Sequence, residues 1–254
     1  TGLKENKFGI PSDSVFETYA YAASLPNLDV VGIDCHIGSQ LTETQPFVDA
    51  LDRVITMIDR LKTMAITLTH IDIGGGLGVT YKDEVPPTVA EYANAMKPAL
   101  EKLGLKVYME PGRSISANAG VLITKVDLLK PTNHRNFAIV DAAMNDLIRP
   151  SLYEAWMDIQ EVNANTTTEK KEWDVVGAIC ETGDFLGKER QLAIQANDNL
   201  AVLGAGAYGF VMSSNYNSRG RAAEVMVDGD VAHLIRERET IESLWEKERL
   251  LPAE

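Results

Sequence analysis

Cysteine, positive charge and long apolar runs are all scarce in this sequence. Only Cys35 and Cys180 occur among 254 residues, which argues against a disulfide framework and suits a reducing, cytoplasmic environment. The formal net charge of −13 argues against nucleic acid or an anionic membrane as partner, because long-range repulsion opposes both. No apolar run reaches the ~18 residues that span a bilayer, and TGLKENKFG at the start lacks the apolar core of a secretion signal. The expected partner is therefore a small molecule.

The composition, 45% hydrophobic and 24% charged, is that of a globular protein with one large domain or two small ones. Up to about residue 120, strand and helix patterns alternate. Helices are predicted from residue 12, over 45–64 and over 87–103, and strands over LDVVGIDCHIGS, LTHIDIGGG and LKVYMEPG. Such alternation predicts parallel strands with crossover helices, whose functional residues gather at the carboxyl ends of the strands.

After residue 120 the pattern changes to shorter runs rich in valine, isoleucine and leucine. The predicted strands are GVLITKVDLLKP, FAIVDA, WDVVGAICE and AEVMVDGDVAHLIR. These runs predict a mainly antiparallel β domain with short helices.

The first predicted strand ends in HIGSQ and the second in DIGGGLG. Consecutive glycines let backbone N–H groups face an anion, so a phosphate is a natural guest, although a tight turn without ligand stays open as an alternative. A dinucleotide site is disfavoured, because the spacing is not G-x-G-x-x-G. His36 by itself is more often a structural residue, but beside a phosphate its ring can stack on an aromatic cofactor while Ser39 donates to the phosphate.

The third strand end is EPGR, which fixes Glu110 and Arg113 around a stiff Pro-Gly pair. A carboxylate beside a pyridine nitrogen favours the protonated ring and makes that ring a stronger electron sink. The guanidinium offers a planar fork for a carboxylate or a phosphate. The alternative is a surface turn with an ordinary ion pair, worth about 0–1 kcal/mol.

Three further motifs lie in the predicted β domain: RPSLY, CETGD and GAGAYGF. The unperturbed thiol pKa of about 8.5, and the carboxylate of Glu181 next to Cys180, favour the protonated thiol, a better proton donor than nucleophile. By itself Cys180 is still more often a small buried hydrophobe. RPSLY alone indicates little.

In this order, the motifs HIGSQ, DIGGGLG, EPGRSI, RPSLY, CETGD, GAYG and NYNSRGRAAEV resemble those of the fold type III pyridoxal-phosphate-dependent decarboxylases. The resemblance covers essentially the whole chain and is strongest to the members that act on meso-diaminopimelate. It implies an alanine racemase-like (β/α)₈ TIM barrel that binds pyridoxal 5'-phosphate, represented here by its second part over residues 1–120, and then a β domain over 121–254. It also implies a homodimer with shared active sites that converts meso-diaminopimelate to L-lysine and carbon dioxide in lysine biosynthesis.

The resemblance further implies a role for each motif residue. In the cofactor site, His36 would stack on the ring, Glu110 would face the pyridine nitrogen, and the N–H of Gly76 would hold the phosphate. Cys180 would donate the proton and Glu181 would contact the distal amino group, both in the active site of the partner subunit. The implied catalytic residues are Cys180, Glu110 and His36. The implied cofactor-binding set is His36, Ser39, Gly76, Glu110, Pro111, Gly112, Arg113 and Tyr208. The implied substrate-binding set is Arg113, Arg149, Tyr153, Glu181 and Tyr208, and no metal is expected.

The lysine that binds the cofactor covalently in this family lies in a YAxKAN-like segment, which this sequence lacks. A complete barrel takes about 250 residues, whereas only about 120 here have the barrel pattern. We therefore expect a carboxyl-terminal portion of a longer enzyme, inactive by itself. Two alternatives stay open: a decarboxylase of the same fold that acts on ornithine, arginine or carboxynorspermidine, and a non-catalytic protein that binds the cofactor or a partner.

Overall fold

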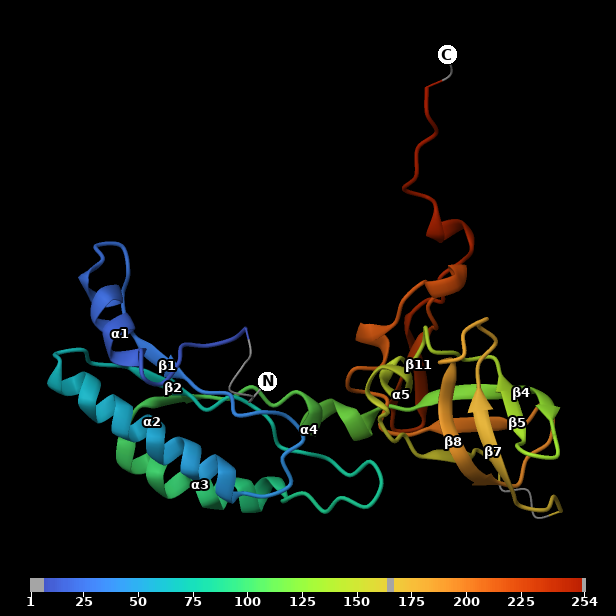
Figure 1. Ribbon diagram of the computed structural model, residues 1–254, viewed down its shortest axis with the longest axis horizontal. Coiled ribbons are helices and arrows are strands. Elements are labelled where there is room, and N and C mark those ends of the chain that lie inside the picture. Colours follow the sequence, from blue (N-terminus) through green and yellow to red (C-terminus); the bar gives the residue numbers. More distant parts are fainter. Residues whose placement is uncertain (1–6, 164–166, 253–254) are drawn as a thin grey trace. The chain divides into compact units, whose positions relative to one another are not determined.

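The computed structural model describes residues 7–163 and 167–252, and the chain packs as two compact units (Figure 1). The first unit is Thr1–Ile115 and the second is Ser116–Glu254. The change of sequence pattern that we placed at residue 120 lies close to this division. None of the helices within the described ranges has the length and apolar character that crossing a bilayer requires.

The first unit is a three-stranded parallel sheet with helices between its strands. Its elements are α1 (Val15–Ser24), β1 (Gly32–Asp34), α2 (Gln45–Thr63), β2 (His70–Asp72), α3 (Val89–Leu103) and β3 (Lys106–Tyr108), and α4 (Arg113–Ser116) follows at the boundary between the units. The sheet order is β1-β2-β3, with both pairs parallel. The predicted alternation is confirmed. The strands are only three residues long, much shorter than the apolar runs suggested, because the chain leaves the sheet at each glycine-rich segment.

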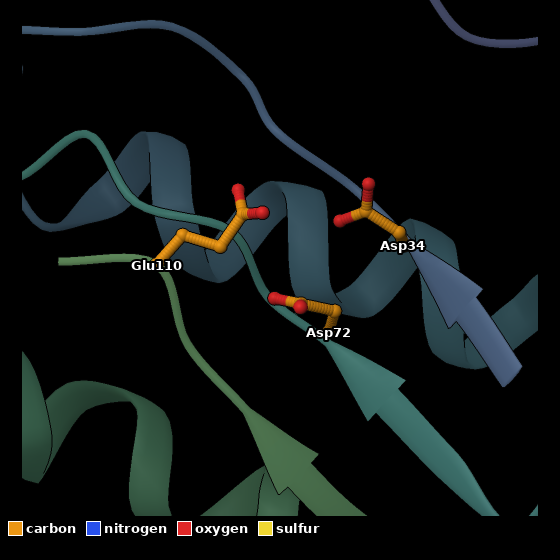
Figure 2. A group of neighbouring side chains, drawn as sticks. All are labelled: Asp34, Asp72 and Glu110. Carbon is orange, nitrogen blue, oxygen red and sulfur yellow. The ribbon is translucent and has the colours of Figure 1, made fainter. Parts of the chain in front are cut away.

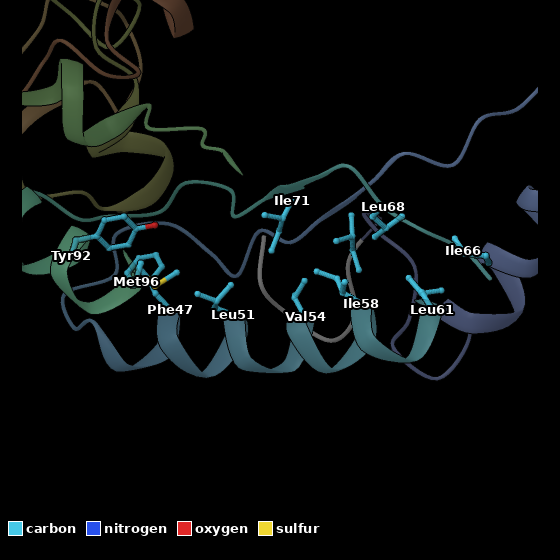
Figure 3. Packing of buried hydrophobic residues seen from close by; sticks show 11 residues of the cluster. Phe47, Leu51, Val54, Ile58, Leu61, Ile66, Leu68, Ile71, Tyr92 and Met96 are labelled. Carbon is cyan, nitrogen blue, oxygen red and sulfur yellow. The ribbon is translucent and has the colours of Figure 1, made fainter. Parts of the chain in front are cut away.

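Helix α2 presents its apolar face to the sheet (Figure 3). Apolar residues three or four positions apart fall on one side of a helix, and this side packs against Leu68 and the central strand residue Ile71. The buried residues that α2 contributes are Phe47, Leu51, Val54, Ile58 and Leu61. The core thus fixes the central strand, and with it the position of the loop that follows β2.

Both ends of α3 follow from the local sequence. Thr88 and Glu91 form a reciprocal capping box at the start, and Gly104 ends the helix in a left-handed conformation with φ 69°. The predicted start at residue 87 is therefore two residues early, since Thr88 takes the capping position. The Gly104 end brings the chain directly into β3.

The second unit contains a six-stranded mixed sheet and a separate hairpin. Its strands are β4 (Leu122–Lys130), β5 (Phe137–Val140), β6 (Ile159–Glu161), β7 (Lys171–Val176), β8 (Phe185–Leu192), β9 (Asn199–Val202), β10 (Glu224–Asp228) and β11 (Val231–Arg236). Its helical segments are α5 (Arg149–Tyr153), η1 (Ala117–Ala119), η2 (Phe210–Met212), η3 (Tyr216–Ser218) and η4 (Glu242–Leu244). The order is β6-β9-β4-β5-β7-β8, and among the described residues β10 and β11 form a separate two-stranded sheet. All pairs are antiparallel except β5–β7, so the mainly antiparallel prediction holds.

The predicted strand WDVVGAICE is wrong in its second half. Strand β7 ends at Val176, and residues 177–184 form an irregular connection to β8. Gly177 has the side-chain oxygens of Asp184 at 2.4 and 2.6 Å from where a Cβ would stand, so the chain turns there around a carboxylate. The consequence is that Cys180 lies in a loop and not in a strand.

Candidate functional site

The segments that follow the three strands of the first unit lie in contact with one another through their backbones. A Cβ added to Gly75 would lie 2.1 Å from the carbonyl oxygen of Glu110, and one added to Gly76 would lie 2.3 Å from that of Gly38. Gly76 also has φ 113°, a conformation that side chains rarely adopt. The glycine triplet is therefore needed for the close approach of the HIGS, GGG and EPG segments.

His36 is held by the glycine triplet. The Gly75 N–H donates to its Nδ1 at 3.2 Å, and the preceding Gly74 N–H donates to the Asp72 carboxylate at 2.8 Å. The ring is exposed, not buried in the core. Because Nδ1 accepts this hydrogen bond, the imidazole orientation is fixed relative to the loop after β2.

Arg113, which follows β3, lies beside Ser39, which follows β1. Its Nε and Nη2 donate to the Ser39 Oγ at 3.3 and 3.1 Å, and its Nη1 donates to the hydroxyl of Tyr81 at 2.6 Å. Ser39 follows Gly38, whose carbonyl packs on Gly76. A cationic group, a hydroxyl and a glycine backbone therefore lie together, which are groups suited to a phosphate.

Glu110 belongs to a cluster of three carboxylates (Figure 2). Asp34, Asp72 and Glu110 each place one carboxylate oxygen within 4.8 Å of one oxygen of the other two. Burial, and then the negative charge of Asp72, raise the pKa of Asp34 above the ordinary aspartate value, against the opposing effect of His36. Such a cluster favours a positively charged guest, either a metal ion or a protonated ring nitrogen.

Replacement of Asp34 by asparagine tests the repulsion in this cluster. When folding raises the pKa of a carboxyl, the protein loses stability as the pH rises from the pKa of the unfolded state through the pKa of the folded state. We therefore expect Asp34→Asn to raise the free energy of unfolding of the cofactor-free protein at pH 7 and to have little effect near pH 3. Urea unfolding at the two pH values measures this, with the exposed Asp83→Asn as the control. Equal effects at both pH values would contradict it.

In the second unit, Cys180 and Glu181 are exposed in the loop of residues 177–184. The interpretation of Cys180 as a buried hydrophobe is therefore wrong. The Glu181 Oε1 accepts the Gly183 N–H at 3.0 Å, which fixes the carboxylate against its own loop. Thiol and carboxylate are thus presented next to each other by one turn.

The loop containing Cys180 is joined to α5, the helix of the RPSLY motif. The hydroxyl of Ser151 in α5 donates to the Gly183 carbonyl. Tyr153 is exposed, whereas Arg149 is 7% exposed and places Nη1 3.2 Å from the Met157 sulfur. Two motifs about 30 residues apart in sequence are therefore brought together, although the Arg149 side chain is more buried than a substrate contact suggests.

Tyr208 lies in the loop after β9 and is partly exposed. Its φ of 60° is unusual for a side chain of this size. The same loop continues to Ser214, whose N–H donates to the carbonyl of the buried Asn145 at 2.9 Å.

Pro111 and Gly112 are exposed between Glu110 and Arg113 in the first unit.

Comparison with known proteins finds relatives along nearly the whole chain. Residues 1–117 match the family described as "Pyridoxal-dependent decarboxylase, pyridoxal binding domain". The chain is 60% identical over 252 residues to the diaminopimelate decarboxylase of Pseudomonas fluorescens and 50% identical over 242 residues to that of Neisseria meningitidis serogroup B. Residues 1–117 are thus similar to the pyridoxal-binding domain of these decarboxylases. These alignments cover 99% and 95% of this chain but 60% and 58% of the relatives, so the chain spans about 60% of their length.

Solved structures share the fold of this chain. AQ1208 from Aquifex aeolicus is 45% identical with a TM-score of 0.92, over 94% of this chain and 60% of that protein. Diaminopimelate decarboxylase from Helicobacter pylori, complexed with L-lysine, is 39% identical with a TM-score of 0.91, over 98% and 62%. The succession of a parallel α/β unit and a β unit therefore has close counterparts of known structure.

Sequence reasoning missed Asp34, Asp72 and Tyr81. The two aspartates are the last residues of β1 and β2 and face each other in the strand register. That shared position was a usable signal, because the carboxyl ends of neighbouring parallel strands meet at one edge. No pattern marked Tyr81, which contacts Arg113 from a loop.

Proposed function

We propose that this chain is the part of a diaminopimelate decarboxylase that binds pyridoxal 5'-phosphate and supplies the proton donor for conversion of meso-diaminopimelate to L-lysine and carbon dioxide. The observation that carries the proposal is the meeting of His36, Gly76 and Glu110 at one edge of a three-stranded parallel sheet. The relatives of 60% and 50% identity bear this enzyme's name.

The residues of the first unit fit both charged ends of this cofactor. The Ser39 hydroxyl, the Arg113 guanidinium and the glycine backbone around Gly76 suit a phosphate. The cluster formed by Asp34, Asp72 and Glu110 suits a protonated pyridine nitrogen, because three carboxylates within 4.8 Å favour a cation. Pyridoxal 5'-phosphate, when bound, supplies a ring that accepts the electron pair released as carbon dioxide leaves.

The protein's own contribution in the first unit is to orient the ring and hold a proton on it. Glu110 would keep the ring nitrogen protonated, and His36 would lie against the ring in the orientation that the Gly75 N–H imposes. Arg113 would bind the phosphate end or a substrate carboxylate through its fork of N–H donors.

The second unit would supply the proton and the substrate contacts. Cys180 would donate the proton of its Sγ to the carbon that has lost carbon dioxide, and Glu181 beside it would bind the distal amino group. Arg149, Tyr153 and Tyr208 would complete the substrate contacts. The Ser151–Gly183 hydrogen bond supports this grouping for α5 and the loop containing Cys180.

The remaining parts of the proposal concern the assembled enzyme. The first unit would form the second part of a (β/α)₈ barrel, and two chains would form a homodimer in which Cys180 and Glu181 of one subunit act at the cofactor of the other. The compartment would be the cytoplasm, in keeping with the two free cysteines.

A side-by-side assay tests the substrate. A polypeptide of the relatives' full length that contains this chain should release carbon dioxide from meso-diaminopimelate with kcat/KM roughly 10²-fold or more above that for L-ornithine, L-arginine or carboxynorspermidine. The reason is that free ornithine and free arginine lack the distal carboxylate that Arg149 of the protein would bind. Preference for another of these substrates would identify the corresponding alternative enzyme. Absence of all four activities, together with cofactor binding, would indicate a non-catalytic protein.

A further inference from the structure

The loop that carries Cys180 and Glu181 has no regular structure of its own. It connects the antiparallel neighbours β7 and β8 through residues 177–184, and both side chains are exposed. An exposed irregular loop samples many conformations unless specific contacts fix it. Its position therefore depends on groups that the proposed function has not yet assigned.

Asp184, at the end of this loop, is such a group. Asp184 is only 4% exposed, and its carboxylate accepts two hydrogen bonds. One oxygen accepts the N–H of Ile179, the residue before Cys180, at 2.7 Å. The other accepts the N–H of Met144, from a different segment, also at 2.7 Å. The carboxylate thus ties the Cys180 backbone to a fixed neighbour.

The backbone of Asp184 closes the same loop. Its N–H donates to the Glu181 carbonyl at 3.0 Å, and its carbonyl accepts the Gly177 N–H at 3.3 Å. Asp184 is therefore hydrogen-bonded to Gly177, Ile179 and Glu181, which lie on both sides of Cys180.

The Asp184 carboxylate packs directly against the backbone of Gly177. A Cβ on Gly177 would lie 2.4 and 2.6 Å from the two Asp184 oxygens and 2.5 Å from the Ala143 Cβ. A buried carboxylate with two short N–H donors is held more strongly than a neutral acceptor, because hydrogen bonds to a charged group are about twice as strong. Glycine at 177 is thus required for the position of the carboxylate.

We propose that Asp184 is a positioning residue that sets the place of the Cys180 thiol and the Glu181 carboxylate, with Gly177 providing the space for its side chain. The proposal rests on the roles of Cys180 and Glu181 in the proposed function. Asp184 itself contacts backbone N–H groups and acts on the reaction only through this loop.

The first test is Asp184→Asn in the holoenzyme. The amide keeps the shape but places an NH₂ group against one of the two N–H donors, so the loop loses one anchor. We expect unchanged cofactor absorbance and a kcat about 10- to 100-fold lower, the loss that corresponds to one hydrogen bond to a charged group. Gly177→Ala, which would displace the carboxylate without removing it, should lower kcat in the same way.

Asp174→Asn is the matched control, because Asp174 in β7 is also a buried carboxylate that accepts two hydrogen bonds. Its partners are the Glu189 N–H and the Arg135 guanidinium, both at 2.9 Å and both outside the loop. Asp174→Asn should lower the melting temperature to a similar extent and leave kcat unchanged. If both variants lowered kcat equally, the effect would be general destabilisation and the proposal would be overturned.

A double-mutant cycle separates positioning from damage. If Asp184 acts through Cys180, Asp184→Asn should change kcat far less in a Cys180→Ala background than in the native enzyme. The same factor in both backgrounds would overturn the proposal.

Hydrogen exchange supplies a readout that needs no substrate. The amides of Met144 and Ile179 should exchange faster in Asp184→Asn than in Asp174→Asn. Failure of the proposed function would leave the parent enzyme without decarboxylase activity, whereas failure of this inference would leave it active and these amides equally protected in both variants.

Discussion

Replacing Cys180 by alanine is expected to lower the kcat of the holoenzyme about 10²–10⁴-fold, the usual contribution of a positioned general acid. The thiol is exposed in a loop of the second unit, whereas the groups proposed to bind the cofactor, apart from Tyr208, lie between residues 34 and 113. The cofactor absorbance should therefore stay the same. Because Glu181 remains in place, KM should change much less than kcat.

The other cysteine of the chain provides the control for this prediction. Cys35 is half-buried and packs against the apolar core beside β1. Burial and the charge of Asp34 raise its pKa above the ordinary thiol value, so it is still further from the reactive thiolate form. Cys35→Ala should lose some stability and keep kcat. An unchanged kcat in Cys180→Ala would remove Cys180 from the proposed reaction.

The sequence predicted best those features that depend on local pattern. The apolar spacing of residues 45–64 predicted α2 almost to its ends, and Gly104 marked the end of α3. The three polar strand ends were also recognised, because apolar strands followed by glycine are a strong local signal. Their meeting at one edge follows from the parallel order of β1, β2 and β3.

The features that the sequence did not predict depend on partners distant in the chain. Strand β8 has the sequence FLGKERQL. Because of its charged residues, this segment is not recognised as a strand from the sequence until its pairing with β7 is known. Asp34 and Asp72 matter only because the strand register sets them side by side next to Glu110. Asp184 is the last residue of CETGD, and its two backbone partners, Met144 and Ile179, cannot be inferred from that motif.

Glu110→Gln is expected to lower kcat by about 10²–10³, the range seen when one preorganised electrostatic contact to the reacting system is lost. Glutamine keeps the size of the side chain and the backbone bond from the Glu110 N–H to the Gly74 carbonyl at 2.9 Å. What changes is the charge that would keep the ring nitrogen protonated. The absorbance of the bound cofactor should change as well, which distinguishes this variant from Cys180→Ala.

Glu101→Gln is a suitable control, because Glu101 is an exposed residue of α3 that forms an exposed ion pair with Lys97 at 3.5 Å. It should leave both kcat and absorbance unchanged. Incubation with a chelator addresses the other chemistry open to the cluster formed by Asp34, Asp72 and Glu110. Loss of activity on chelation, restored by a divalent metal, would assign the carboxylates to a metal ion and contradict the assignment of Glu110 to the ring nitrogen.

Mixing the two inactive variants tests whether the active site is shared between subunits. If Cys180 of one subunit serves the cofactor bound near Glu110 of the other, a mixed dimer of Cys180→Ala and Glu110→Gln has one site with both native residues. Random exchange of subunits should then restore about one quarter of the native kcat, because half of the dimers are mixed and each has one native site. If both residues of a site came from the same subunit, every site in the mixture would lack one of them, and no activity would return.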